Sequence, residues 1–135
     1  MVLEVYLMNL YYDQHYTREE IDSILVKIKS CVEKNRYTIL LNENRQENLD
    51  FINEYNISSD KQKSILMQIE TDAFCYSLQN NETGYECEVL YVFVQQVQLF
   101  NAEGVEETVD VYMKFNVIDL PFGNQVVVIS FHKES

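Results

Sequence analysis

The stretch Val109-Asp110-Val111-Tyr112-Met113-Lys114-Phe115-Asn116-Val117 decides the fold, because apolar and polar residues alternate along its whole length. Successive side chains of a strand point to opposite faces of the sheet. The odd-numbered residues are therefore expected to face a core, and the even-numbered ones to face outward. The last part of the chain shows the same pattern, with Ile129 and Phe131 on one face and Ser130 and His132 on the other.

A face that carries tyrosine, lysine and histidine has the groups that metal-free RNA cleavage requires. If the two strands pair as a hairpin, Tyr112, Lys114, Ser130 and His132 share one exposed face. Cleavage through the 2′-hydroxyl needs a base on that hydroxyl, an acid on the leaving 5′-oxygen and a cation on the phosphate. Polar residues are equally expected on the outer face of any antiparallel sheet, and a histidine near a chain end is often simply solvated. The pattern alone leaves catalysis as a hypothesis.

Three helices are predicted between residues 17 and 70. The first begins at the capping box Thr17-Arg18-Glu19-Glu20, ends near Asn35 and carries one apolar stripe: Ile21, Ile24, Leu25, Ile28 and Val32. The second is expected from an Asn42 cap to about Tyr55, after a short strand or extended link at 37–41. The third begins at the capping box Ser59-Asp60-Lys61-Gln62, and its inward positions are Ile65, Leu66 and Ile69.

After residue 70 the hydrophobic period changes from helical to alternating. Strands are predicted at 74–79, 87–100, 105–118 and 125–132, with a loop at 80–85 and turns at 101–104 and 120–124. The alternation slips at Gln95-Gln96, which predicts a bulge there. Helices followed by a strand meander indicate an α+β fold, with the N-terminal helices packed on one face of an antiparallel sheet.

The composition indicates one small globular domain. The chain has 135 residues, of which 47% are hydrophobic, and three glycines and one proline leave little room for linkers. We expect a single domain over 1–135, made of an N-terminal extension (1–16), a helical part (17–70) and a sheet part (73–133).

The sequence argues against several classes of protein. No stretch approaches the length of a membrane span, and the first ten residues are too short and too polar for a secretion signal. The cysteines Cys31, Cys75 and Cys87 are odd in number and lack metal-ligand spacing, which favours reduced thiols in a cytoplasmic protein. No phosphate-binding loop or nucleophile motif is present, so we expect neither a cofactor nor a metal.

The formal net charge of −12 is unusual for a protein that binds nucleic acid, because phosphate contacts normally require an excess of Lys and Arg. Three explanations remain open. The acidic residues serve solubility alone, a basic partner covers them, or the chain mimics nucleic acid.

Several stretches resemble the MqsR (motility quorum-sensing regulator) family, toxins of RelE-like fold that are ribonucleases. The resemblance runs over about residues 17–133. It rests on three stretches, taken in order: Tyr37-Thr38-Ile39-Leu40-Leu41-Asn42; Asp72-Ala73-Phe74-Cys75-Tyr76-Ser77-Leu78; and Val111-Tyr112-Met113-Lys114 followed by Val128-Ile129-Ser130-Phe131-His132-Lys133. The order of the elements is similar as well.

The active site of that family consists of two lysines, a glutamine and a tyrosine. Only some of these residues have counterparts in this chain. The tyrosine matches Tyr112, and Lys114 matches a family lysine beside it. The C-terminal lysine falls on His132, which still permits acid–base chemistry, whereas the other lysine falls on Tyr76 and its charge is lost. The glutamine falls near Val92, and Gln95 or Gln96 would supply an amide only if a bulge shifts the register.

The resemblance implies a toxin of a toxin–antitoxin system, an endoribonuclease that cleaves mRNA through the 2′-hydroxyl. It implies RNA and a cognate antitoxin as partners, and a homodimer is a further expectation. Tyr112, His132 and Lys114 are then the catalytic residues, and the substrate-binding residues are Tyr76, Ser130 and Lys133. Because two positions depart from the family pattern, a non-enzymatic acidic binding protein, such as a nucleic-acid mimic that inhibits a host enzyme, remains the alternative.

Overall fold

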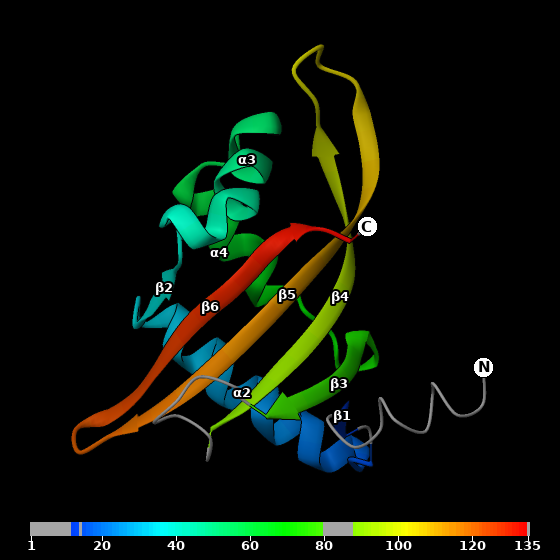
Figure 1. Ribbon diagram of the computed structural model, residues 1–135. Coiled ribbons are helices and arrows are strands. Elements are labelled where there is room, and N and C mark those ends of the chain that lie inside the picture. Colours follow the sequence, from blue (N-terminus) through cyan, green and yellow to red (C-terminus); the bar gives the residue numbers. More distant parts are fainter. Residues whose placement is uncertain (1–11, 14, 80–87, 135) are drawn as a thin grey trace.

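The chain folds as an α+β structure in which helices pack on a curved sheet of six strands (Figure 1). The computed structural model describes residues 12–13, 15–79 and 88–134. The predicted loop at 80–85 and most of the N-terminal extension lie outside the described residues. The elements in chain order are β1 (Tyr12–Asp13), α2 (Arg18–Glu33), β2 (Tyr37–Ile39), a 3-10 turn η1 (Glu43–Arg45), α3 (Gln46–Glu54), α4 (Ser59–Met67), a 3-10 turn η2 (Thr71–Ala73), β3 (Phe74–Gln79), β4 (Val89–Phe100), β5 (Glu106–Leu120) and β6 (Gly123–Lys133).

The sheet is mixed, whereas the sequence predicted a purely antiparallel one. Its strand order is β1-β3-β4-β5-β6-β2, and only the β2–β6 pair is parallel. The predicted meander from β3 to β6 is confirmed as the centre of the sheet. The two edge strands come from the first half of the chain, so the segments expected as an extension and as a helical part each contribute one strand.

Helix α2 begins and ends at caps that satisfy its terminal backbone groups. The Thr17 hydroxyl accepts from the Glu20 amide, and the Glu20 carboxylate accepts from the Thr17 amide, which confirms the predicted capping box. At the other end Lys34 is the cap, one residue before the predicted Asn35. Asn35 follows at a φ of 60°, and the Arg36 amide donates to the Cys31 carbonyl, which is a Schellman ending.

The other two helices begin differently from the prediction. The Asn42 side chain makes no capping hydrogen bond, and the segment expected as one helix is a 3-10 turn followed by α3. Helix α4 is capped by Ser58, one residue before the predicted cap, and the Ser58 hydroxyl accepts from the Lys61 amide. The expected inward positions Ile65 and Leu66 of α4 are confirmed, whereas Ile69 is buried but follows the helix, which ends at Met67.

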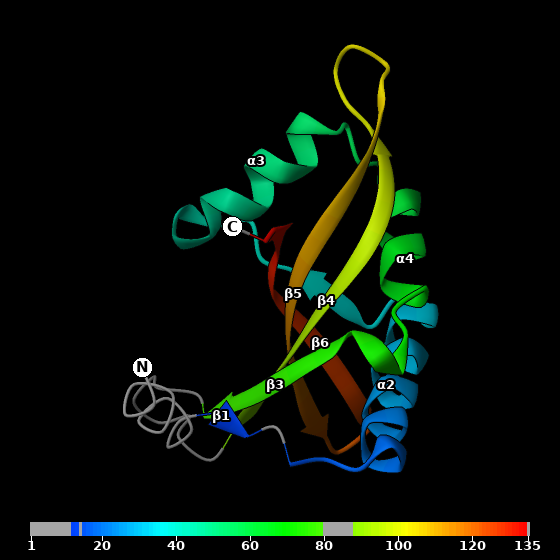
Figure 2. The same cartoon turned by 90° about the vertical axis from the view of Figure 1, so that its right-hand side faces the viewer.

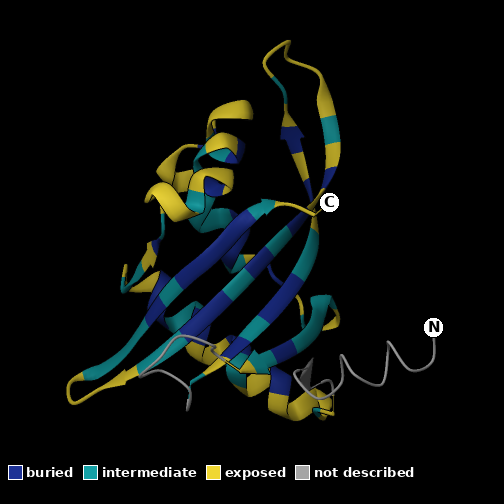
Figure 3. Cartoon of the chain, viewed as in Figure 1, coloured by how far each residue is buried: buried dark blue, intermediate teal, exposed yellow. Residues whose placement is uncertain are grey.

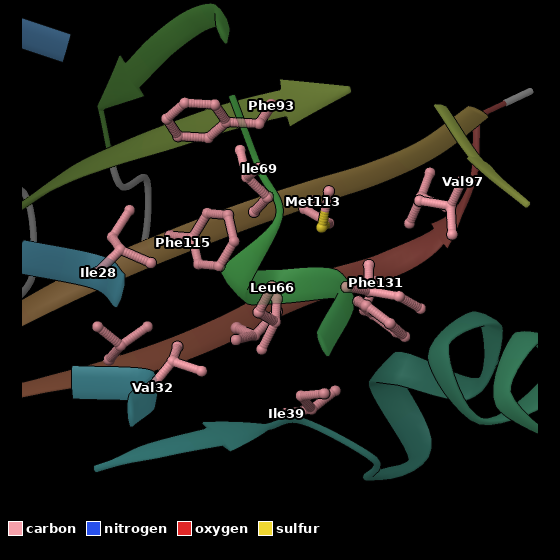
Figure 4. Close-up of a cluster of buried hydrophobic side chains, with 14 of the residues drawn as sticks. Ile28, Val32, Ile39, Leu66, Ile69, Phe93, Val97, Met113, Phe115 and Phe131 are labelled. Carbon is pink, nitrogen blue, oxygen red and sulfur yellow. The ribbon is translucent and has the colours of Figure 1, made fainter. Parts of the chain in front are cut away.

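The core lies between the sheet and helices α2 and α4 (Figures 2 and 4). Edge-to-face aromatic contacts connect Phe74 to Phe93 and Phe93 to Phe115 across three strands. Helix α3 packs against the β6 edge, where the Phe51 ring contacts Phe131 at 5.5 Å. Among the described residues, no helix has the length and apolarity that crossing a membrane would require.

Two bulges interrupt the ladders, and neither lies at the predicted position. β4 pairs with β5 in unbroken register through Gln95 and Gln96, so the bulge predicted there is wrong. The register shifts instead between Phe74 and Tyr76, and between Lys114 and Phe115 against β6. The second shift leaves Ile129 as the extra residue of β6, because Lys114 pairs with Ser130 while Phe115 pairs with Val128.

Candidate functional site

The register places most of the predicted site residues in two neighbouring rows across the sheet. One row runs Tyr76–Val92–Lys114–Ser130 over strands β3 to β6. The next row contains Tyr112 directly opposite His132. Directly opposed residues of antiparallel strands share a face, so Tyr76, Tyr112, Lys114, Ser130 and His132 form one cluster on the sheet face turned away from α2 and α4. We call this cluster the tyrosine–histidine face.

The bulge at Ile129 is what brings His132 to this face. Before the bulge, the even-numbered Val126 and Val128 pair with core residues of β5 and are fully buried. Strict alternation would then place the even-numbered His132 on the core side as well. The extra residue reverses the alternation, so Phe131 enters the core and His132 faces the opposite way.

Three aromatic rings are in contact on this face. The hydroxyls of Tyr76 and Tyr112 are hydrogen-bonded at 3.1 Å, although the residues belong to strands separated by β4. The rings of Tyr112 and His132 are stacked, with centroids 5.3 Å apart and planes inclined by 18°. Cross-strand packing therefore fixes the His132 ring beside the Tyr112 ring.

The hydrogen bonds of His132 indicate which nitrogen is available for proton transfer. Its Nδ1 lies 2.8 Å from the Lys133 carbonyl, which can only accept, so Nδ1 carries a hydrogen and donates it. The Glu47 carboxylate lies 3.9 Å from the same nitrogen, close enough for charge attraction. This tautomer leaves Nε2 as the nitrogen that exchanges a proton with a bound molecule.

Lys114 supplies a positive charge in surroundings that disfavour its charged form. Its side chain is half-buried in the middle of the sheet, and this burial lowers the pKa of its ammonium below the ordinary value. The positive charge of Arg45, at the end of η1, lowers that pKa further. Two cations whose charges interact on a protein of net charge −12 concentrate positive charge at this position, where an anion would offset their repulsion.

Arg45 and Glu47 are the site residues that sequence analysis missed. Both lie where η1 passes into α3, a region without strand alternation, and no local pattern relates it to the last strand. The buried Asn48 holds this region in place. Its amide donates to the carbonyls of Leu40 and Ile129, and its oxygen accepts from the Phe131 amide, so α3 is fixed to the β6 edge.

Lys133, predicted to bind substrate, is separate from the other predicted residues. It pairs with Val111 and so lies on the core side of β6, where its ammonium is 2.7 Å from a Glu54 oxygen and 4.9 Å from the Tyr55 ring centroid. Its hydrogen bond to Glu54, followed by that to Tyr55, raises the pKa of Lys133. Lys133 therefore joins the end of β6 to α3.

No shift of register brings Gln95 or Gln96 to the position of Val92, on which the glutamine of the MqsR family falls. Val92 has no exposed surface and lies between Tyr76 and Lys114. The Gln95 side chain accepts from the Glu70 amide and pairs with Val111, on the core side. Gln96 lies on the same side of the sheet as Tyr112 but opposite Asp110, one row further along. Of the two glutamines, only Gln96 shares the face.

The tyrosine–histidine face combines an imidazole, two phenol hydroxyls and the Lys114 ammonium, and the charge of Arg45 acts on that ammonium. Ser130 was expected at an exposed position, and this is wrong, because Ser130 and its neighbour Val92 are buried. Figure 3 shows the middle of β5 and β6 as buried or intermediate, between the exposed surfaces of α3 and the hairpin ends. These groups can transfer protons and neutralise an anion. Within the described residues, no three His, Cys, Asp or Glu side chains are grouped so that they could hold a metal ion.

No protein-family model matches the chain, and no protein of curated function matches it.

Proposed function

We propose that the chain is a metal-independent endoribonuclease that cleaves RNA through the 2′-hydroxyl at the tyrosine–histidine face. The observation that carries this proposal is the stacked pair of Tyr112 and His132, with Lys114 one row away and under the influence of the Arg45 charge. An acid–base pair next to two cations meets the needs of phosphodiester cleavage.

The reaction needs no group beyond those of the RNA and the protein. The 2′-oxygen attacks phosphorus, its proton passes to Nε2 of His132, which the Nδ1-protonated tautomer leaves free, and the bond from phosphorus to the 5′-oxygen breaks. The Tyr112 hydroxyl gives its proton to that 5′-oxygen, and the products carry a 2′,3′-cyclic phosphate and a free 5′-hydroxyl. The proton on His132 then passes through solvent to the Tyr112 oxygen, which restores both groups. Lys114 and Arg45 neutralise the charge on the phosphate as it becomes crowded, and Tyr76 orients the Tyr112 hydroxyl or stacks on a base.

We further propose that the chain is a RelE-like toxin, a divergent relative of the MqsR family, that cleaves mRNA in the cytoplasm and is neutralised by a cognate antitoxin. The resemblance around Tyr112 and His132, together with the α+β order of elements, supports this assignment. A neighbouring gene that encodes a small DNA-binding protein would be the expected antitoxin gene. Growth arrest on expression, relieved by co-expression of that gene, is the expected result.

The test of cleavage uses purified protein and an end-labelled single-stranded RNA in the presence of EDTA. We expect cyclic-phosphate products from the wild type, and a loss of rate of about a hundredfold or more in His132→Ala and in Tyr112→Phe. The matched control is His15→Ala, which removes the chain's other histidine, outside the two rows. Equal activity in the wild type and both site variants would exclude these residues from the mechanism. A substrate with 2′-deoxyribose at the cleaved nucleotide should stay intact.

A second candidate function follows from the net charge of −12. An acidic binding protein that mimics nucleic acid would bind a basic partner with strong salt dependence and would not cleave RNA. The described part of the tyrosine–histidine face is mixed in charge, with Lys114 and Arg45 near Glu47, which favours the nuclease. Absence of cleavage by the wild type, together with tight binding to a basic protein, would favour the mimic.

A further inference from the structure

A second surface lies at the opposite end of β6 from His132, between helix α2 and the β5–β6 hairpin. Here a groove of about 360 Å³ opens to solvent. We call it the hairpin groove, and its lining includes Val26, Lys27, Lys34, Arg36, Phe122 and Asn124. In Figure 1 the hairpin is the orange-to-red turn at the lower left. None of the residues of the tyrosine–histidine face lines this groove.

The groove exposes more apolar surface than a hairpin tip normally does. Phe122 is 77% exposed and Val26 is 66% exposed, and these are the two most exposed large apolar side chains among the described residues. Phe122 occupies a two-residue turn, a position at which polar residues and glycine prevail. Single exposed apolar residues are common, whereas these two line the same groove.

Three cations surround these apolar side chains. Lys27, Lys34 and Arg36 all line the groove, and no Asp or Glu of the described residues does so. The chain has only ten Lys and Arg residues, so almost a third of them gather at this one position on a molecule of net charge −12. The groove therefore gathers three positive charges, and Asp119, the strand partner of the lining residue Asn124, does not itself line it.

Arg36 is held in a fixed position within the groove. Its guanidinium lies 5.6 Å from the Phe122 ring centroid and donates to the Phe122 carbonyl. Gly123, at a φ of 132°, leaves the space that the guanidinium occupies. The Arg36 backbone also pairs with Val126 of β6, so the cation and the hairpin are one rigid unit. A preorganised arginine loses little side-chain entropy when it binds a carboxylate.

From this geometry we propose that the hairpin groove is a docking site for an acidic segment of another protein, one with an apolar side chain between carboxylates. The apolar side chain packs against Val26 and Phe122, and the carboxylates pair with Lys27, Lys34 and Arg36. The proposal is independent of RNA cleavage, because the groove shares no residue with the tyrosine–histidine face.

A polypeptide fits the groove better than a nucleic acid does. Single-stranded RNA binds by stacking bases on aromatic rings along a row of cations. Of the described residues, Phe122 alone contributes an aromatic ring to the groove, and Arg36 already contacts that ring. The aliphatic Val26 offers neither a stacking surface nor a hydrogen bond. A branched or aromatic side chain of a peptide can pack against both Val26 and Phe122. The volume of the groove suits one or two such side chains.

The test selects short random peptides displayed on phage against the full chain. Bound peptides are counter-selected on Lys27→Glu/Lys34→Glu, and their affinities are then measured by fluorescence anisotropy. We expect enriched peptides with net negative charge around an aromatic or branched apolar residue. Their affinity should fall about tenfold or more in the double variant and in Phe122→Ser. Circular dichroism and thermal unfolding confirm that these surface variants are folded.

The matched control is Lys29→Glu/Lys61→Glu, which changes the net charge by the same amount on side chains that do not line the groove. It should leave peptide affinity unchanged. Failure to enrich any peptide, or equal loss of affinity in both double variants, would overturn the proposal. A single-stranded RNA oligonucleotide that loses more affinity than the peptides would assign the groove to nucleic acid. A change of molecular mass in light scattering would assign it to a second copy of the chain.

Discussion

Lys114 serves the proposed function, but its buried charge lowers the stability of the folded state. Its half-buried ammonium faces Arg45, and both burial and this like charge lower its pKa. Below the lowered pKa, Lys114 is charged in the folded and in the unfolded state, and the folded state carries the full cost of desolvation. As the pH rises through the lowered pKa toward the ordinary value of 10.5, the folded state loses its proton first and the cost disappears.

Replacing Lys114 with methionine should therefore raise the free energy of unfolding at neutral pH, by about 1 kcal/mol because the side chain is only half-buried. Urea unfolding of Lys114→Met and of the wild type measures the difference. The gain should shrink at alkaline pH, where the wild-type lysine is neutral, and RNA cleavage should be lost at every pH. Lys61→Met, at an exposed position of α4, is the control and should change neither quantity. A less stable Lys114→Met protein would contradict this account.

Gly123 is the second position at which one residue fixes local geometry. At a φ of 132° an alanine is strained, and its Cβ would also meet the Arg36 guanidinium. We expect Gly123→Ala to lower the free energy of unfolding by about 2 kcal/mol and to displace Arg36 from the hairpin groove. Thermal unfolding measures the first effect, and affinity for the selected acidic peptides measures the second.

Gly104→Ala separates the two effects of the Gly123 substitution. Gly104 also has a positive φ, of 77°, but an added Cβ there would meet no atom within 4 Å. This variant should lose stability through the backbone alone and keep its peptide affinity. If both variants lost peptide affinity equally, the position of Arg36 would have no role in docking.

At the scale of elements, the contact between α3 and β6 depends on one side chain. β2 stops pairing with β6 after Val128, and Asn48 then makes the next contacts with the β6 backbone. Asn48→Leu removes three hydrogen bonds and leaves the Phe131 amide without its partner in a buried place, which should cost about 3 kcal/mol. Chemical denaturation measures the loss. Because Arg45 and Glu47 leave the site when α3 detaches, the rate of RNA cleavage should fall as well.

Asn53→Leu is the matched control, because Asn53 is an exposed residue of the same helix. It should leave stability within about 0.5 kcal/mol of the wild type and should not change cleavage. A loss of stability in Asn48→Leu with full cleavage activity would show that α3 does not contribute to the tyrosine–histidine face.

The helices and strands also show which structural features could be predicted from the sequence. The alternation around Tyr112 and the capping box at Thr17 are local signals, and both predictions are confirmed. Ser130 and His132 were assigned to the same face correctly, but the bulge that places them there was predicted in β4. A bulge is a property of two paired strands, and the sequence of one strand does not specify the register of its partner.

At the scale of the whole molecule, the features that the sequence did not predict are non-local. The parallel pairing of Tyr37–Ile39 with Val126–Val128 joins segments almost ninety residues apart, and three residues carry too weak a pattern to indicate a partner. The charge of Arg45 acts on Lys114 across a distance in sequence of about seventy residues, and the Asn48 hydrogen bonds join α3, which follows Arg45, to β6. The site could be predicted as far as its strand residues extend, and no further.

The charge of the whole molecule predicts an unusual salt dependence for RNA binding. Each phosphate contact to single-stranded RNA contributes a slope of about −0.7 to log K against log salt. Lys114 and Arg45 supply two such contacts, so a slope of about −1.4 is the steepest expected from the tyrosine–histidine face. The net charge of −12 repels RNA at long range, and because salt screens this repulsion, the observed slope should be shallower still.

Anisotropy titrations of His132→Ala, which binds without cleaving, measure the slope. Lys114→Met should remove about half of it, whereas a slope steeper than about −4 would require a larger basic surface and would place RNA elsewhere on the molecule.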